Sequence, residues 1–352
     1  MIDSNNYIEL CQNDKLISMR GIQISSAKPK ITSLITVYNS EKYIKNAVRS
    51  IQNQNISDIE ILIIDDSSKD NSLYILKQLK KEDNRIKIIR NKKNKGILYS
   101  KSLGIIKAKG KYIMSLDSDD YFINGELFFK CFKEAIENYI DIIEFSGFAS
   151  HFTKFNLYGT LPGIPMYFKY KTHNYYVRQP QLSKFIYQKL ENNKYKLIDG
   201  YLTGKCIKTY ILKKTIRIIG EKIYKQRMNF GDDRLINYVL FKIAKTFKFI
   251  RIFGYAYNYN NISITHVNNS YNNCHDELIN IRNIYKFTKF TNDTELAAFE
   301  IFNRYEKIIK PGLNKNNSNY LNCLIKQMLN DKYISIFYKE KLINITNNLM
   351  II

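Results

Sequence analysis

Three clusters of aspartates are the side chains of this sequence best suited to chemistry. They are Asp65–Asp70 (DDSSKD), Asp117–Asp120 (DSDD) and Asp232–Asp233. Like charges packed together cost free energy unless a cation is near. The hard cations Mg²⁺ and Mn²⁺ take oxygen ligands and leave positions open for phosphate oxygens. DSDD, with three carboxylates within four residues, therefore indicates a divalent metal and phosphate site.

Each cluster also has an ordinary structural explanation. An aspartate that follows a strand often caps the next helix or closes an Asx turn. Asp232 and Asp233 begin a predicted helix, where the macrodipole favours carboxylates, so on its own this pair is best explained as a helix cap. DDSSKD and DSDD are stronger signals, because each directly follows an apolar strand and the two occur together.

Short apolar runs alternate with helical patterns between residues 30 and 145. This alternation is typical of βαβ units and a parallel sheet, whose ligands lie beyond the carboxyl ends of the strands. We therefore expect DDSSKD and DSDD to converge on one crevice of an α/β fold. The predicted strands are 31–37, 59–64, 86–89 and 112–116, and the predicted helices are 41–54, 71–81, 96–108 and 125–138.

The rest of the chain is less regular. Residues 150–200 form a tyrosine-rich insert for which we expect loops and one helix near 181–190. A further helix is predicted from Asp233, where Ile236, Leu240 and Ile243 follow at helical spacing. From about residue 275 the pattern indicates mostly helix.

The composition excludes some classes of protein. The 352 residues carry a formal charge of +23 and are 45% hydrophobic, which excludes a disordered tail or a fibre. The charge suggests nucleic acid or an anionic membrane as partner, but a bias towards Ile, Lys, Asn and Tyr accounts for much of it. Five scattered cysteines without a C-x-x-C pair argue for reduced thiols and against zinc.

The chain also lacks the sequence signals of export and membrane insertion. Its first residues have no basic segment followed by an apolar run, as a secretory signal would. No uncharged apolar stretch reaches the length of about 18 residues needed to span a bilayer. We therefore expect a cytoplasmic protein, at most peripheral to an anionic membrane.

An ordered set of motifs between residues 30 and 265 resembles the family 2 glycosyltransferases, which are inverting, nucleotide-sugar-dependent enzymes with the GT-A fold. The resemblance covers about two thirds of the chain. It implies a Rossmann-like, mostly parallel α/β sheet flanked by helices, with a helical C-terminal region. The matching segments are ITVYNSEKYI (35–44), IEILIIDDSSKDNS (59–72), NKGILYSKSLGIIKAKGKYIMSLDSDD (94–120), YLTGKCIKTYIL (201–212), MNFGDDRLINY (228–238) and YAYNYNNISIT (255–265).

The resemblance implies roles on the donor side, position by position. Thr36 and Tyr38 would line the nucleotide pocket, and Asp66 would hydrogen-bond the base. Asp117 and Asp119 match the D-x-D pattern that holds the ribose and the metal-bound diphosphate.

The resemblance also implies a metal, Mn²⁺ or Mg²⁺, and a catalytic base. It leaves the metal ligand open between Asp119 and Asp120. Asp233 matches the aspartate of the family's E-D pair and would be the base, and Asp232 stands in place of the glutamate.

Two departures from the family bear on the nucleotide pocket. Ser67 stands where relatives usually have glycine, the residue that tolerates a positive φ. Lys101 and Ser102 stand where relatives have Arg-Asn, so a point charge replaces a bidentate guanidinium. Both leave the fine geometry of the pocket open.

The chemistry of sugar transfer needs the two kinds of acidic site that the sequence offers. A metal held by carboxylates stabilises the charge on a leaving diphosphate, and a second carboxylate accepts the proton of the attacking hydroxyl on the opposite face. We therefore predict a metal-dependent inverting glycosyltransferase of the hexosyltransferase type. It would move a sugar from a nucleoside-diphosphate donor, expected to be a UDP-sugar, to a hydroxyl of a glycan, lipid or protein, as in polysaccharide or glycoprotein biosynthesis.

The expected domains follow from the extent of the resemblance. They are an N-terminal extension (1–29), a catalytic domain (30–265) with a nucleotide-sugar half (30–145) and an acceptor half (146–265), and a helical region (266–352). The alternative is a basic protein that binds nucleic acid or an anionic membrane without catalysis. It is disfavoured because lysines are spread along the chain whereas the acids are clustered, and no nucleic-acid partner is expected.

Overall fold

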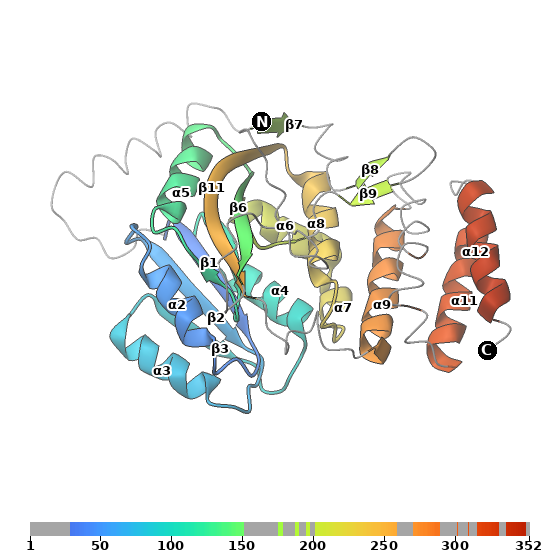
Figure 1. Ribbon diagram of the computed structural model, residues 1–352, viewed down its shortest axis with the longest axis horizontal. Helices are drawn as coiled ribbons and strands as arrows, with labels where there is room; N and C mark the ends of the chain where they lie inside the picture. The colour runs from blue at the N-terminus through green and yellow to red at the C-terminus, as the bar shows by residue number, and fades with distance from the viewer. Residues whose placement is uncertain are drawn as a thin grey trace.

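The computed structural model of the protein describes most of the chain from residue 29 onward. Figure 1 shows a twisted sheet flanked by helices at one side and a row of helices leading away from it. The described residues are 29–150, 175–178, 187–189, 195–197, 201–258, 270–288, 301, 309, 315–330 and 336–349.

The elements alternate as expected in the first part of the chain. They are β1 (Ile31–Val37), α2 (Ile44–Gln52), β2 (Ile59–Asp65), α3 (Ser72–Glu82), β3 (Ile86–Arg90), α4 (Ile97–Lys107), β4 (Tyr112–Asp117), β5 (Tyr121–Phe122), α5 (Leu127–Glu137) and β6 (Ile142–Ser150). The strands and helices predicted between residues 31 and 138 are confirmed, with ends that differ by a few residues.

The second part of the chain mixes strands with helices. Its elements are β7 (Tyr175–Arg178), β8 (Tyr187–Lys189), β9 (Tyr195–Leu197), β10 (Lys205–Lys208), α6 (Thr209–Ile219), α7 (Glu221–Tyr224), α8 (Asp232–Ile243), β11 (Thr246–Asn258), α9 (Ser270–Thr288), α11 (Lys315–Leu329) and α12 (Ile336–Leu349). The helix predicted near 181–190 is wrong where the structure describes it. Residues 187–189 form β8, in which Tyr187 lies opposite Leu197 of β9, and tyrosine is a residue that favours strands.

Nine strands of the described residues form one sheet, in the order β3-β2-β1-β4-β10-β6-β11-β5, with β7 on β11. The four strands from β3 to β4 are parallel. Beyond them β10 runs antiparallel to both β4 and β6, and β11 returns parallel to β6. The expected parallel sheet is therefore present in the half that carries DDSSKD and DSDD, and the other half is mixed.

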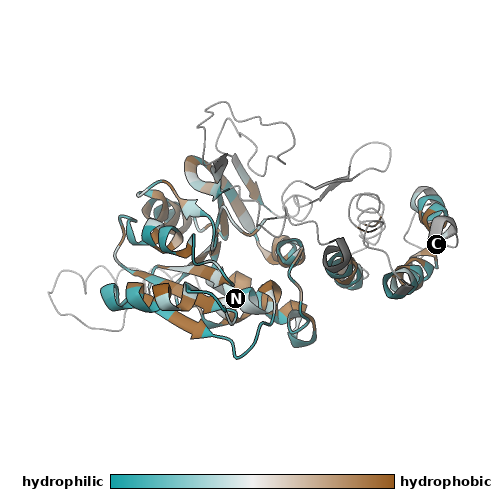
Figure 2. Cartoon of the chain, turned by 60° about the horizontal axis from the view of Figure 1, so that its bottom comes forward, coloured by the Kyte–Doolittle hydropathy of each residue, from teal (hydrophilic) through white to brown (hydrophobic). Residues whose placement is uncertain are grey.

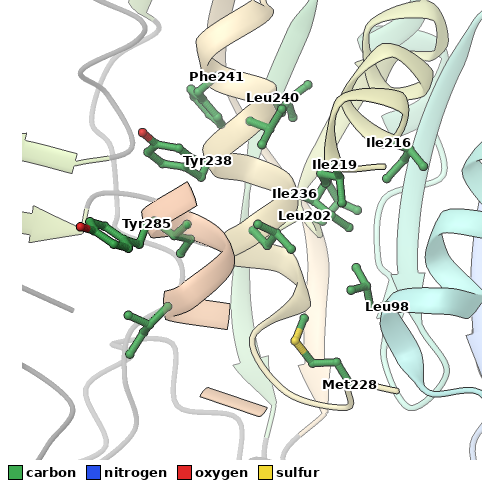
Figure 3. Close-up of a cluster of buried hydrophobic side chains, with 14 of the residues drawn as sticks. Leu98, Leu202, Ile216, Ile219, Met228, Ile236, Tyr238, Leu240, Phe241 and Tyr285 are labelled. Atoms are coloured by element: carbon green, nitrogen blue, oxygen red, sulfur yellow. The ribbon is translucent and has the colours of Figure 1, made fainter. Parts of the chain in front are cut away.

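Both faces of the sheet are buried, which explains why its strands are nearly continuous apolar runs. Leu34 and Ile64 belong to the hydrophobic cluster on one face, whereas Ile35 and Ile63 belong to the cluster on the other. Figure 2 shows the strands in the brown of hydrophobic residues between helices with hydrophilic outer surfaces. The first cluster continues through α4, α6 and α8 to α9, as Figure 3 shows.

The C-terminal region is helical where it is described, as expected. α9 packs on α8, α11 packs on α9, and α12 packs on α11, which gives the row of helices in Figure 1. None of the helices in the described ranges combines the length and the apolar character needed to cross a membrane.

Helix α4 approaches the sheet closely because residue 104 is glycine. A Cβ at Gly104 would meet Cδ1 of Leu34 and lie 2.9 Å from its Cδ2 and 3.2 Å from Cγ1 of Ile64. Both neighbours are buried, and a packed core has little room to yield. The close approach brings the side chains of α4 to the edge of the sheet that carries the acidic clusters.

We expect Gly104→Ala to destabilise the fold by about 1–3 kcal/mol, the usual cost of an extra group in a packed core. Urea unfolding followed by circular dichroism measures this change. Gly125→Ala is the matched control, because its Cβ would have one neighbour, Asn53 O, at 3.3 Å. Equal midpoints for the two variants would contradict the close approach of α4.

Candidate active site

Three parallel strands end at one edge of the sheet and bring two acidic clusters to that edge. In strand register Thr36 lies opposite Ile64 of β2 and opposite Asp117 of β4. Tyr38, just beyond β1, is 44% exposed. DDSSKD and DSDD therefore lie on either side of the end of β1, as the strand pattern predicted.

Asp66 fixes the loop that leads into α4. Its carboxylate accepts hydrogen bonds from Asn91 Nδ2 at 2.7 Å and from the backbone N–H groups of Lys95 and Gly96 at 2.9 and 2.8 Å. The side chain is buried. Asp66 thus ties the loop of residues 91–96 to the carboxyl end of β2.

The turn after Asp66 keeps a left-handed conformation without glycine. Ser67 has φ 66°, which costs a non-glycine residue about 1 kcal/mol or more. The next residue compensates in part, because the N–H of Ser68 donates to Oδ1 of Asp65 at 3.1 Å. The first departure from the family therefore leaves the turn in place.

The three carboxylates of DSDD have different surroundings. Asp120 is buried and accepts hydrogen bonds from the hydroxyl of Tyr255 and from the backbone N–H of Asn258, the latter at 2.8 Å. The side chain of Asp117 is 35% exposed, and Asp119 is partly exposed. Asp120 is thus engaged by β11, whereas Asp117 and Asp119 are partly exposed at the edge of the sheet.

The third cluster lies beside the second, although the two are far apart in sequence. Asp232 and Asp233 form the first turn of α8. The amine of Lys101, on α4, lies 2.5 Å from Asp233 Oδ1, 2.9 Å from Asp232 Oδ2 and 3.9 Å from Asp117 Oδ1. One buried lysine therefore contacts carboxylates of both clusters.

Burial and the charges of neighbouring side chains set the protonation of Lys101 and of the three carboxylates around it. Burial alone would lower the pKa of Lys101, but the charges of Asp232, Asp233 and Asp117 raise that pKa well above its usual value. Burial also opposes the charged form of Asp233, yet Lys101 and the N–H of Leu202 lower the pKa of this carboxyl below its usual value. Asp233 is therefore ionised at neutral pH and aimed by two donors.

The pKa values of Asp232 and Asp117 shift in the opposite direction, above their usual values. Burial raises the pKa of Asp232 to about 7, with Lys101 opposing the shift and Asp233 adding to it. Burial also raises the pKa of Asp117 to about 6, again against Lys101 and with the charges of Asp233 and Asp119. The site holds more negative charge than Lys101 can neutralise.

Lys101 was not predicted as a site residue. The sequence signal was its position in a motif, since it replaces an arginine of the resembling family, but its partners come from segments up to 132 residues away. Leu202 was missed in the same way, because its backbone N–H donates to Asp233 Oδ2 at 3.2 Å. No local pattern reveals such pairs.

The donor set fits a divalent cation whose shell is completed by a substrate. Within the described ranges no three His, Cys, Asp or Glu side chains gather as a metal site. Mg²⁺, however, commonly binds through one or two carboxylates together with substrate phosphates. Burial, and after it repulsion by neighbouring carboxylates, raises the pKa of Asp117 and of Asp120, and a bound cation relieves such repulsion.

The chain matches a known family over the part that contains DDSSKD and DSDD. The model of the family "Glycosyl transferase family 2" matches residues 32–206, about half of the chain. An uncharacterized glycosyltransferase of Haemophilus influenzae is 37% identical over 99 residues, which are 28% of this chain and 40% of that protein. The GalNAc(5)-diNAcBac-PP-undecaprenol beta-1,3-glucosyltransferase of Campylobacter jejuni is 35% identical over 100 residues, 28% of this chain and 32% of that protein.

The fold has solved counterparts over a longer span. The crystal structure of S. aureus TarS in complex with UDP-GlcNAc superposes with a TM-score of 0.63, over 88% of this chain and 82% of that one. At 16% sequence identity this likeness concerns the fold, which is of the expected GT-A type. The curated relatives are matched over less than half of their own length. The chain belongs to glycosyl transferase family 2, with the family's domain at residues 32–206.

Proposed function

We propose that the protein is a metal-dependent inverting glycosyltransferase that moves a sugar from a UDP-sugar to a hydroxyl of a glycan or a lipid-linked glycan. The observation that carries the proposal is the contact of one lysine, Lys101, with Asp117 on one side and with Asp232 and Asp233 on the other. A site for a leaving diphosphate and a site for a base thereby lie side by side, as displacement at an anomeric carbon requires.

The donor side is built from the ends of β1, β2 and β4. Tyr38 offers an exposed ring on which a nucleotide base can stack, and Thr36 lies at the floor between the clusters. Asp66 orders the adjoining loop, and its direct hydrogen bond to the base stays a prediction. The UDP-GlcNAc in TarS supports a uridine nucleotide.

We assign the metal, Mn²⁺ or Mg²⁺, to Asp119 and not to Asp120. The oxygens of Asp120 already accept hydrogen bonds from Tyr255 and Asn258. A bound cation would supply Lewis-acid stabilisation of the charge that develops on the diphosphate. Asp117, next to Asp119, is left to hold the ribose or to share the cation.

On the acceptor side Asp233 takes the proton. As the acceptor oxygen forms its bond to the anomeric carbon, the bond from that carbon to the diphosphate oxygen breaks, and the hydroxyl proton passes to the carboxylate of Asp233. A single attack from the opposite face inverts the configuration. Lys101 keeps this carboxylate ionised, and Asp232, with a pKa of about 7, lies beside it.

The acceptor class rests on the relatives. The Campylobacter protein is named for transfer to an undecaprenol-linked glycan, which supports a glycan or lipid-linked acceptor here. The alternative, a non-catalytic basic binding protein, has no support from the site, because its charged groups are mainly carboxylates.

A panel of UDP-sugars with Mn²⁺ tests the proposal through release of the nucleoside diphosphate. We expect turnover with at least one donor, and a loss of about 100-fold or more in Asp233→Asn, the usual contribution of a general base. Asp83→Asn, which removes a carboxylate that follows helix α3 and pairs with Arg85, is the control and should retain full activity. Full activity in Asp233→Asn would exclude it as the base.

The pH profile tests the role of Lys101. Without Lys101 the effect of burial on Asp233 loses its main opposing charge, so the pKa of Asp233 rises and a higher pH is needed to ionise the base. We therefore expect the acid limb of kcat/KM to move to higher pH in Lys101→Met and to stay near its wild-type position in Lys101→Arg. An unmoved limb in Lys101→Met would show that another group controls the base.

The division of labour within DSDD predicts two different phenotypes. Asp119→Asn should raise the Mn²⁺ concentration needed for half-maximal turnover by about tenfold or more, because a charged ligand is lost. Asp120→Asn should leave that concentration unchanged but lower the unfolding midpoint, since a buried acceptor of two hydrogen bonds is altered. Metal titrations and thermal unfolding separate the two, and the reverse pattern would move the metal to Asp120.

A further inference from the structure

Helix α9 lies beyond the part of the chain that the family model matches. It nevertheless contacts the turn of residues 228–233, which carries the proposed base. The side chain of Asp276 accepts the backbone N–H of Asn229 at 2.8 Å and also that of Phe230. Asp276 is buried. It therefore fixes the backbone two and three residues before Asp232.

The next residue of α9 fixes the other side of the turn. The carboxylate of Glu277 accepts hydrogen bonds from both terminal guanidinium nitrogens of Arg234, the residue directly after Asp233. The distance from Nη1 to Oε1 is 2.8 Å. The two side chains are 0% and 8% exposed. A buried pair of this kind often adds little to stability, because removing two charges from water is costly. Its bidentate geometry does, however, specify how α8 lies on α9.

The turn is pressed against α9 at Gly231. This residue has φ 79°, and a Cβ here would lie 2.7 Å from Arg234 Nη2 and 2.8 Å from Nδ2 of Asn280. Asn280 lies one helical turn after Asp276, so the two project from the same face of α9. Asp276, Glu277 and Asn280 together form the surface on which the base-carrying turn rests.

The opposite side of the turn contacts the loop of residues 91–96 and the start of α4. The backbone N–H of Leu98 donates to Met228 O at 3.2 Å, and the side chains of Leu98 and Met228 lie near each other in the core, as Figure 3 shows. A Cβ at Gly96 would lie 2.9 Å from the backbone of Met228. The turn is thus held between α9 and the loop that Asp66 orders.

From these contacts we infer that Asp276 and Glu277 are positioning residues for the base Asp233. Helix α9 therefore contributes to the geometry of the transfer site. The inference rests on the proposed function. Neither residue contacts the reacting atoms. Each acts by holding the first turn of α8, where a displacement of about 1 Å can cost about 100-fold in rate.

The double variant Arg234→Met/Glu277→Leu tests this role without leaving a buried charge unpaired. Apolar replacement of a buried ion pair is often neutral for stability. We expect the full-length double variant to retain the wild-type unfolding midpoint and the wild-type KM for the UDP-sugar, while kcat for nucleotide release falls at least tenfold. Asp276→Asn, which keeps one acceptor oxygen, provides an independent second variant with the same expected split.

Asp141→Asn is the matched control for a purely structural carboxylate. Asp141 is buried, accepts the backbone N–H of Lys245 at 2.8 Å and pairs with Lys208 at 3.5 Å, but it precedes β6, at the edge of the sheet opposite the site. It should lose stability and retain kcat at temperatures where it is folded.

The outcomes separate the inference from the function on which it rests. A kcat within twofold of wild type in the double variant, or a kcat loss no greater than that of Asp141→Asn, would overturn the positioning role and leave the glycosyltransferase intact. Absence of turnover in the wild type with every donor would overturn the proposed function and this inference with it.

Discussion

The site depends on the ion pairs that the amine of Lys101 forms with neighbouring carboxylates. Carboxylates from two distant segments gather around this amine, and without a cation they would repel one another or bind protons. Lys101 lies within 4 Å of Asp117, Asp232 and Asp233, so it compensates part of this charge and joins the two clusters. It leaves an excess of negative charge, which is the physical reason for the divalent cation that we propose.

Close packing of α4 on the sheet positions the amine of Lys101 at the site. Gly104 lets α4 lie directly on β1 and β2, and Lys101 is three residues earlier on the same helix, almost one turn away. The start of α4 is set by Gly96, whose N–H is held by Asp66 and whose lack of a side chain admits the backbone of Met228. The same helix therefore connects the loop of residues 91–96 with Asp117 and with the first turn of α8.

The sequence predicted what is local and left out what is not. The strands and helices up to residue 138 follow from periodicity, and the placement of DDSSKD and DSDD at one edge follows from the rule for parallel strands. The contacts of Lys101 with α8, and of Asp120 with Tyr255, join residues more than 130 positions apart. Such pairs are decided by tertiary packing, which no spacing rule contains. The helix predicted near 181–190 was wrong at residues 187–189, the described part of that range, because a short tyrosine-rich segment has no long-range periodicity to separate helix from strand.

The excess of positive charge on the chain has a different meaning at the site than at the surface. Lysines on the surface are solvated and screened, so a formal charge of +23 says little about chemistry. Lys101 is buried, and the carboxylates around it raise its pKa; its charge is therefore fixed and acts in a medium of low dielectric, where electrostatic interactions are stronger. One lysine in this position decides the ionisation of Asp233, and the informative feature of a basic sequence is accordingly the place where its acids are gathered around a single buried cation.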